Sequence, residues 1–369
     1  MKKKIGVCCI SDPENPKTWS GTPSNICDKF KRRDSFGASI FGLPHKSLKL
    51  AFLASLSALL KLEPHNSRLY RHAKLVREYH GLHISEQMLK SGLKYFLHLA
   101  GDRYLPLAQT PPGSKNFLLI DATWRYWKNS TLKKSYIDEV DADMAASYQA
   151  MDHIFSISEH TKLSLVEEYG ISTDKITVVG TGLGTIKPYF GQKNYSSPTI
   201  LFVAKERFED KGGLSLFYAF KEARKKNENL KLWLVGDPNL QKLAIKEKNV
   251  TAFGFLPIKD LQLLFESASL FAMPASREPW GLVYLEAMSC KMPILGLRDK
   301  GAISEITQNG NFGYLIDRPT VSDISEALLN AFSNYEVMEK MGSSAQQYVM
   351  ENFNWDRVAD KILEKIEQY

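Results

Sequence analysis

The sequence predicts an α/β protein built from two Rossmann-like, doubly wound domains that face each other across a deep cleft. At 369 residues the chain is longer than a single hydrophobic core usually supports. Its second half alternates apolar strand candidates with helical patterns, which indicates right-handed β-α-β units around a parallel sheet. Residues 184–198, rich in glycine, proline and serine, lack periodicity and are typical of a linker.

The linker sets the predicted domain boundaries. We expect a first domain over residues 1–186, a linker over 187–198 and a second domain over 199–351. A C-terminal helix at about 352–369 is expected to pack back on the first domain. The predicted strands are residues 4–10, 117–121, 153–157 and 175–179 in the first domain, and 199–203, 230–235, 269–273 and 293–297 in the second.

The composition narrows the function classes. The net charge is +7, but residues 1–134 alone hold 23 Lys and Arg against 9 Asp and Glu, a local net charge of +14. This indicates either an anionic partner or a solvated lysine-rich surface. Aromatic residues do not alternate regularly with the basic ones across residues 1–134, which argues against nucleic-acid binding. Four cysteines without zinc or disulfide spacing favour a reducing cytoplasm.

One basic segment suggests a membrane contact. Residues 46–62 form a strong helical pattern, and five basic residues follow it closely. Such a segment can lie on an anionic membrane surface, such as the inner face of the plasma membrane, or it can be a core helix with charged edges. The five basic residues are Arg68, Arg71, His72, Lys74 and Arg77.

Two glutamates in residues 276–290 are the strongest site candidates. Glu278 lies in a turn after the strand at 269–273, and Glu286 lies inside an apolar helical run. A buried carboxylate without partners costs several kcal/mol, so Glu286 needs either a ligand, such as a ribose diol, or an ion pair with Lys291. The first amides of the helix, those of Gly281, Leu282 and Val283, are predicted to bind an anion.

A second loop adds positive charge. Lys205 and Lys211 flank a turn after the strand at 199–203, and Gly212 and Gly213 open the next helix. Two ammonium groups beside two helix N-termini suit a diphosphate, although surface lysines near a turn are common.

Together these motifs resemble the retaining glycosyltransferases of family four, which have the GT-B fold. That family carries a Gly-Arg…Lys-Gly loop, here Ala204-Lys205…Lys211-Gly212, and a Glu-(seven residues)-Glu motif, here Glu278 to Glu286. The resemblance covers most of residues 153–355. Lys205 replaces the usual arginine, so an ammonium group stands where a guanidinium could form two parallel hydrogen bonds. Trp280 replaces a phenylalanine.

The resemblance implies a nucleotide sugar, such as a UDP- or GDP-sugar, as donor and a glycan or glycolipid as acceptor, with neither cofactor nor metal. Glu278 would contact the donor sugar, Glu286 the ribose, and Lys205 and Lys211 the diphosphate. Front-face transfer with retention would follow, in cell-surface glycan synthesis of a bacterial type. Further donor contacts would come from Gly21, Gly254, Phe255, Leu256, Trp280, Gly281, Leu282 and Val283.

Asp121 is a candidate for positioning the sugar or acceptor, or else it is an N-cap of the next helix.

A nucleotide-sugar epimerase of the same architecture and a non-catalytic nucleotide-sugar binder are the alternative functions. Asp141 and Asp143 could suggest a metal pair, but they lie in an acidic helical stretch remote from the motifs.

Overall fold

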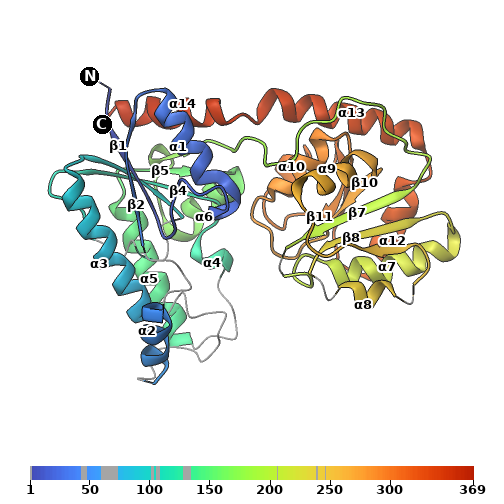
Figure 1. Ribbon diagram of the computed structural model, residues 1–369, viewed down its shortest axis with the longest axis horizontal. Coiled ribbons are helices and arrows are strands. Elements are labelled where there is room, and N and C mark those ends of the chain that lie inside the picture. Colours follow the sequence, from blue (N-terminus) through green and yellow to red (C-terminus); the bar gives the residue numbers. More distant parts are fainter. Residues whose placement is uncertain are drawn as a thin grey trace. The chain divides into compact units, whose positions relative to one another are not determined.

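The computed structural model describes residues 2–42, 48–59, 74–100, 104, 109–127, 134–205, 207–237, 240–245 and 247–369 (Figure 1). The chain forms two compact units. The first consists of Met1–Gly182 and Trp355–Tyr369, and the second of Leu183–Asn354. The chain therefore passes from one unit to the other after Gly182 and again after Asn354.

The first unit is built on a six-stranded sheet in which every paired strand is parallel. The strand order β2-β1-β3-β4-β5-β6 is that of a doubly wound fold, because the chain moves outward from β1 in both directions. The strands are β1 (Ile5–Cys9), β2 (Phe36–Phe41), β3 (Tyr95–Leu99), β4 (Lys115–Ile120), β5 (His153–Ser156) and β6 (Ile176–Val178).

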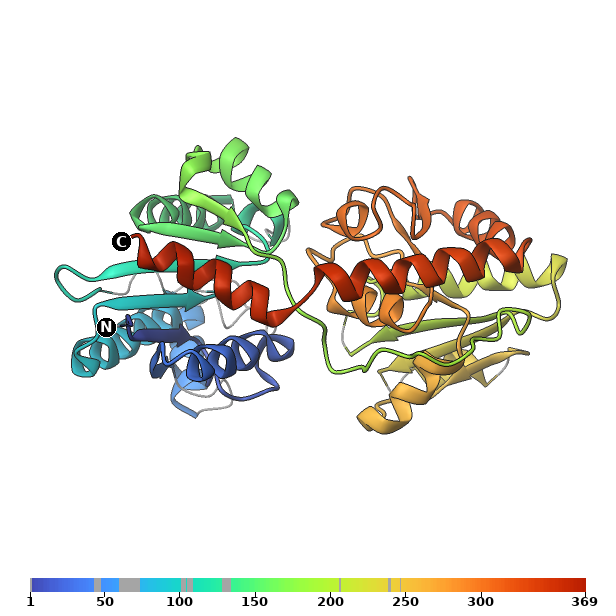
Figure 2. The same cartoon turned by 90° about the horizontal axis from the view of Figure 1, so that it is seen from above.

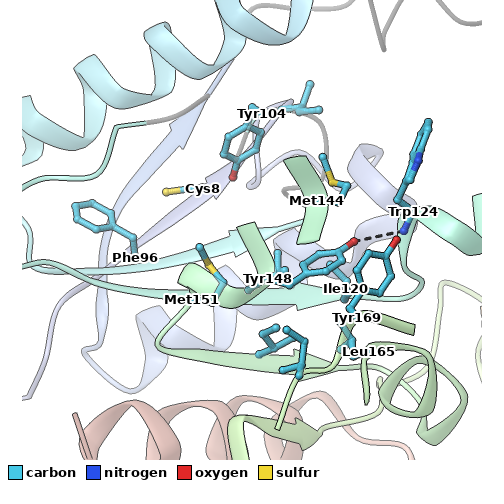
Figure 3. Packing of buried hydrophobic residues seen from close by; sticks show 14 of the residues in the cluster. Cys8, Phe96, Tyr104, Ile120, Trp124, Met144, Tyr148, Met151, Leu165 and Tyr169 are labelled. Atoms are coloured by element: carbon cyan, nitrogen blue, oxygen red, sulfur yellow. Dashed lines mark hydrogen bonds between the residues drawn. The ribbon is translucent and has the colours of Figure 1, made fainter. Parts of the chain in front are cut away.

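Helices cover this sheet. Figure 3 shows the apolar side chains packed beneath the helices, including Tyr148, Met144 and Trp124, where the Trp124 amide donates a 3.4 Å hydrogen bond to the Tyr148 hydroxyl. The helices are α1 (Thr22–Arg32), α2 (Leu48–Leu59), α3 (Lys74–Ser91), α4 (Trp124–Trp127), α5 (Lys134–Ala150) and α6 (Glu159–Tyr169), with short 3₁₀ turns at Thr18–Gly21 and Thr173–Lys175.

The last helix, α14 (Trp355–Glu367), belongs to this first unit and lies beside α1 (Figures 1 and 2). Its apolar stripe is buried. Its acidic residues form ion pairs with Lys29 of α1 and with Arg33, the residue that follows α1. Lys29 Nζ lies 2.9 Å from Asp356 Oδ2, and Arg33 Nε lies 2.6 Å from Asp360 Oδ1. The buried stripe consists of Trp355, Val358, Ala359, Ile362 and Ile366.

The second unit repeats the plan with a parallel sheet of order β12-β11-β10-β7-β8-β9. The strands are β7 (Thr199–Ala204), β8 (Lys231–Gly236), β9 (Val250–Ala252), β10 (Leu270–Ala272), β11 (Ile294–Leu297) and β12 (Gly313–Ile316). The helices are α7 (Gly213–Lys226), α8 (Gln241–Ala244), α9 (Ile258–Ser267), α10 (Leu282–Ser289), α11 (Ile303–Ile306), α12 (Val321–Ala331) and α13 (Tyr335–Asn352).

The predicted fold class is confirmed, since both sheets are parallel and flanked by helices. The helical pattern at 46–62 appears as α2, whose buried side meets α3 through Leu50 and Val76. Its other side is open to solvent, with Leu48 89% and Phe52 66% exposed. No helix in the described ranges is both long and apolar enough to cross a membrane.

Part of the predicted basic segment is buried. Arg77 is 2% exposed, and its Nη2 lies 2.6 Å from Asp143 Oδ2, so this residue does not belong to an exposed basic surface. The difference arises because α3 turns this position toward α5, which carries Asp143. Arg68, Arg71, His72 and the side chain of Lys74 lie outside the described residues.

Candidate functional site

The turn that follows β10 carries Glu278, and neighbouring backbone fixes its course. The Ala302 amide donates to the Pro279 carbonyl at 2.9 Å. Gly301 has φ +93°, and a Cβ at this position would lie 2.0 Å from the Glu278 carbonyl oxygen. A side chain at 301 would therefore push the turn away, which explains the glycine.

The loop after β7 meets this turn at the same edge of the sheet. The Ser276 amide donates to the Asp210 carbonyl at 2.9 Å, so the two loops are joined through their backbones. Lys211 Nζ then lies 3.0 Å from Glu278 Oε2, and Arg207 Nη2 lies 3.5 Å from the same oxygen. One carboxylate thus faces two cations, one of which, Arg207, was absent from the residues predicted for the site.

The structure corrects one prediction about the loop. The amides of Gly212 and Gly213 were expected to bind an anion, but they donate to the carbonyls of Glu209 and Phe208 at 2.8 and 2.9 Å. The reason is that residues 207–213 form a tight turn that uses its own donors. Gly212 is required for packing instead, since it has φ +78° and a Cβ there would lie 2.2 Å from the Pro274 carbonyl oxygen.

The start of α10 keeps its donors available. Gly281 is left-handed at φ +80° and precedes the helix, whose first internal bond runs from the Tyr284 amide to the Gly281 carbonyl. In the described part of the chain, the amides of Gly281, Leu282 and Val283 donate no hydrogen bond. These three donors at a helix N-terminus, next to Glu278 and its cations, are suited to an anionic group.

Glu286, within α10, is held by backbone amides. Its Oε1 accepts hydrogen bonds from the amides of Thr185 at 2.7 Å and Ile186 at 3.1 Å, whereas no hydrogen bond from a described residue reaches Oε2. Burial raises the pKa of this carboxyl, although these amides and the charge of Lys205 oppose the rise. The expected alternative, an ion pair with Lys291, does not form, because Lys291 Nζ donates to the Gly191 carbonyl at 2.9 Å.

Gly184 explains how Glu286 is seated. A Cβ at residue 184 would lie 2.1 Å from Glu286 Oε1. We predict that Gly184→Ala displaces the carboxylate from its amides and weakens nucleotide binding about tenfold, the cost of about 1.4 kcal/mol in one charged contact. Calorimetric titration with a nucleotide measures the effect, with Gly191→Ala as the matched control because the atoms nearest to a Cβ there belong to Tyr189 and not to Glu286. Equal affinities in both variants would contradict the role of Gly184.

The loop after β9 carries the other predicted donor contacts. Gly254 has φ +63°, and its carbonyl accepts the Gly236 amide at 2.9 Å, which anchors the loop to the end of β8. Phe255 is 62% exposed, and Leu256 is half-buried. Trp280 differs from these residues, since its side chain is buried and packs on Phe353 at a centroid distance of 5.8 Å.

The first unit brings together two other predicted residues. Asp121, at the carboxyl end of β4, accepts a 3.4 Å hydrogen bond from Trp19 Nε1, and the next helix, α4, begins three residues later at Trp124. Trp19 and Ser20 have φ +40° and +55°, and Gly21 follows with φ +85°. Successive left-handed residues, one of them a tryptophan, are rare and cluster at functional sites.

The aspartates at 141 and 143 each have an arginine partner. Arg125 contacts both oxygens of Asp141 at 2.7–3.0 Å, and Arg77 contacts Asp143. Opposite faces of α5 thus bind separate cations. Among the described residues, no group of three or more His, Cys, Asp or Glu is placed to hold a metal ion.

These two doubly wound units define a GT-B type fold, and solved structures agree. The sucrose-phosphate synthase from Thermosynechococcus elongatus superposes with a TM-score of 0.70 at 15% identity and covers 99% of both chains. HepE from Anabaena, solved in complex with UDP, gives a TM-score of 0.69 at 15% identity over 99% of this chain and 100% of that one.

Sequence comparison identifies the family. Residues 189–367, close to half of the chain, match the family model of the glycosyl transferases group 1, and this part of the chain belongs to that family. A D-inositol 3-phosphate glycosyltransferase from Paenarthrobacter aurescens is 30% identical over 222 residues, which is 54% of this chain and 53% of that protein. A probable sucrose-phosphate synthase from Thermosipho melanesiensis is 37% identical over 114 residues, 30% of this chain and 26% of that protein. The chain thus spans between about a quarter and about half of these relatives.

Proposed function

We propose that the protein transfers a sugar from a nucleoside-diphosphate sugar to an acceptor hydroxyl, with retention of the anomeric configuration. The observation that carries the proposal is the convergence of Lys211, Arg207 and the α10 amides around Glu278, within the part of the chain that matches the family. Cations and helix amides at one sheet edge suit a diphosphate, and a carboxylate beside them suits sugar hydroxyls.

The donor would lie along the edge of the second sheet. Residues Gly254 to Leu256 would meet the base, with the exposed Phe255 ring as a stacking surface. Glu286 Oε2, which accepts no hydrogen bond from a described residue, would receive the ribose hydroxyls. Lys205, Lys211 and the amides of Gly281, Leu282 and Val283 would hold the diphosphate.

The chemical step would need no protein nucleophile. The bond between the anomeric carbon and the diphosphate oxygen breaks, and the acceptor oxygen bonds to the same face of that carbon. The acceptor proton passes to the departing diphosphate. Lys205 and Lys211 would stabilise the charge that develops there, so catalysis would be mainly electrostatic and positional. In the first unit, Asp121 and the Gly21 loop would position the acceptor or the transferred sugar.

The acceptor class is inferred from relatives and from charge. A lipopolysaccharide 1,2-N-acetylglucosaminetransferase from Salmonella typhimurium is 28% identical over 192 residues, 46% of this chain and 49% of that protein. The local charge of +14 in residues 1–134 would favour an anionic acceptor or surface. A cell-surface glycan or glycolipid fits both observations, with the protein working on the cytoplasmic side.

The test is a thermal-shift screen over UDP-, GDP- and ADP-sugars, followed by turnover of the stabilising donor with candidate acceptors. A ligand at 100 times its Kd should stabilise the protein by about 2.7 kcal/mol. Product that retains the anomeric configuration supports the proposal. Donor isomerisation without acceptor would assign an epimerase instead, and binding without any turnover would assign a non-catalytic binder.

Transfer is expected to continue in saturating EDTA. Lysine and helix amides would provide the positive charge that a divalent ion provides in other transferases, so no metal is required. The measurement is the initial rate with EDTA and with added Mg²⁺ or Mn²⁺. Activity that appears only after a metal is added back would refute this part of the proposal.

Membrane binding is the remaining proposal, motivated by the exposed apolar side of α2. We predict that the protein binds vesicles containing anionic lipid at low salt and that Phe52→Glu weakens binding several-fold, because it removes an inserting ring and adds repulsion. Binding should also fall as the Debye length shrinks from about 30 Å at 0.01 M to about 3 Å at 1 M salt. Co-sedimentation measures this, with Leu163→Glu on α6 as control, since Leu163 is exposed too. Equal binding to neutral and anionic vesicles would contradict this prediction, and a soluble acceptor would then be the remaining proposal.

A further inference from the structure

Arg207 is a cation of the loop after β7 and lies between the two lysines of the motif, Lys205 and Lys211. It lies in the turn between β7 and α7 with a left-handed backbone, φ +57°. Its Nη1 donates to the Arg277 carbonyl at 3.4 Å, and its Nη2 lies 3.5 Å from Glu278 Oε2. Its side chain is one-third exposed, so the guanidinium rests against the Glu278 turn while a ligand can still approach it.

The contacts to Glu278 show where an anionic oxygen is stabilised. Lys211 and Arg207 belong to one loop, and both reach a single carboxylate oxygen of the opposite loop. A phosphate oxygen, like that carboxylate oxygen, is anionic and accepts hydrogen bonds. The pair of cations is therefore placed to share a second anionic oxygen beside Glu278, and the planar guanidinium can contact two phosphate oxygens at once.

The positions of the three cations give the donor a direction. Lys205 directly follows β7, the strand that pairs with β10, and its positive charge opposes the rise in the pKa of Glu286, the expected ribose ligand. Lys211 and Arg207 lie on Glu278, the expected sugar ligand. A diphosphate that joins ribose to sugar would pass Lys205 first and the other two cations second.

We infer that Arg207, together with Lys211, binds the distal phosphate of the donor, the one that carries the sugar. This inference rests on the proposed function and adds to it a phosphate-binding residue that discriminates diphosphates from monophosphates. Arg207 would also orient Glu278, because the same guanidinium would contact the carboxylate and the phosphate.

The test compares nucleoside diphosphates with their monophosphates by isothermal titration calorimetry. UDP, GDP and ADP, with UMP, GMP and AMP, are titrated into the intact protein, Arg207→Gln, Arg207→Lys and Lys205→Gln. Arg318→Gln is the control, because Arg318 forms an exposed surface pair with Asp323 in the same unit. Melting temperatures of all variants verify that they are folded.

Arg207→Gln should weaken binding of the preferred diphosphate about tenfold, the loss of one charge-assisted contact, and change monophosphate binding less than twofold. The diphosphate affinity of Arg207→Lys should lie between those of the unaltered protein and Arg207→Gln, since lysine keeps the positive charge but cannot contact two phosphate oxygens at once. Lys205→Gln should weaken both nucleotides, as expected for the proximal phosphate. Unchanged diphosphate binding in Arg207→Gln, or an equal loss for the monophosphate, would overturn the inference while the proposed function stands. Absence of binding of every nucleotide to the unaltered protein would overturn the proposed function itself.

Discussion

Replacing Lys211 by alanine is expected to abolish measurable sugar transfer and to weaken nucleoside-diphosphate binding at least tenfold. The ammonium group is placed both for the diphosphate and for Glu278, 3.0 Å away. The lost charged contact is worth about 1.5–3 kcal/mol in binding, and losing a donor to charge that develops in the transition state costs a further 10²–10³-fold in kcat, roughly. Calorimetry and initial rates measure the two parts separately.

The control for this variant is Lys231→Ala. Lys231 begins β8 at the opposite end of the strand from the site, and its Nζ is exposed near Ser197 Oγ at 3.4 Å. It should bind and turn over donor like the unaltered protein. If Lys211→Ala bound free nucleoside diphosphate with unchanged affinity, the phosphate site would lie elsewhere.

Glu286→Ala is expected to weaken binding of every nucleotide tested, including monophosphates, by about tenfold to a hundredfold, because the ribose is common to all of them. The substitution also leaves the amides of Thr185 and Ile186 without their acceptor, which adds to the loss. Glu278→Ala should instead lower turnover of the sugar donor and leave monophosphate binding nearly unchanged.

A direct comparison of the two variants decides between these roles. Calorimetry with a monophosphate should separate them, and steady-state kinetics should show a fall in kcat for Glu278→Ala. Equal losses of monophosphate affinity in both variants would mean that the two carboxylates do not divide ribose from sugar.

Most of the strands that the sequence predicted are short, mainly apolar runs. β7, β8, β10 and β11 are buried on both faces, so each is a short hydrophobic run that stands out from its neighbours. The short strands β9 and β12 were missed, as were β2, which Gly37 and Ser39 interrupt, and β3, which includes His98. That imidazole is buried and satisfied by the Tyr104 hydroxyl at 3.0 Å and the Asn116 side chain at 3.2 Å, partners that only tertiary structure reveals.

The parts of the site that depend on sequence spacing were predictable. The parts that depend on how the backbone packs were not. The eight-residue separation of Glu278 and Glu286 places one in the turn and the other in α10. The use of the Gly212 and Gly213 amides within their own turn depends on the conformation of residues 207–213, which no residue pattern specifies. Gly184 is likewise explained only by Glu286, 102 positions later in the chain.

The placement of α14 has a consequence for synthesis on the ribosome. The first unit receives its last helix only after all of Leu183–Asn354 has been made. At roughly 5–20 residues per second this takes about 10–30 s, during which α1 lacks the partners of Lys29 and Arg33 and its apolar neighbours stay uncovered. All six strands of the first unit precede the second unit in the chain, but the first unit is complete only after the second unit, which is continuous in sequence, has been made. Chaperone contacts with the nascent chain are therefore expected to concentrate on the earlier unit and to persist until α14 packs against α1.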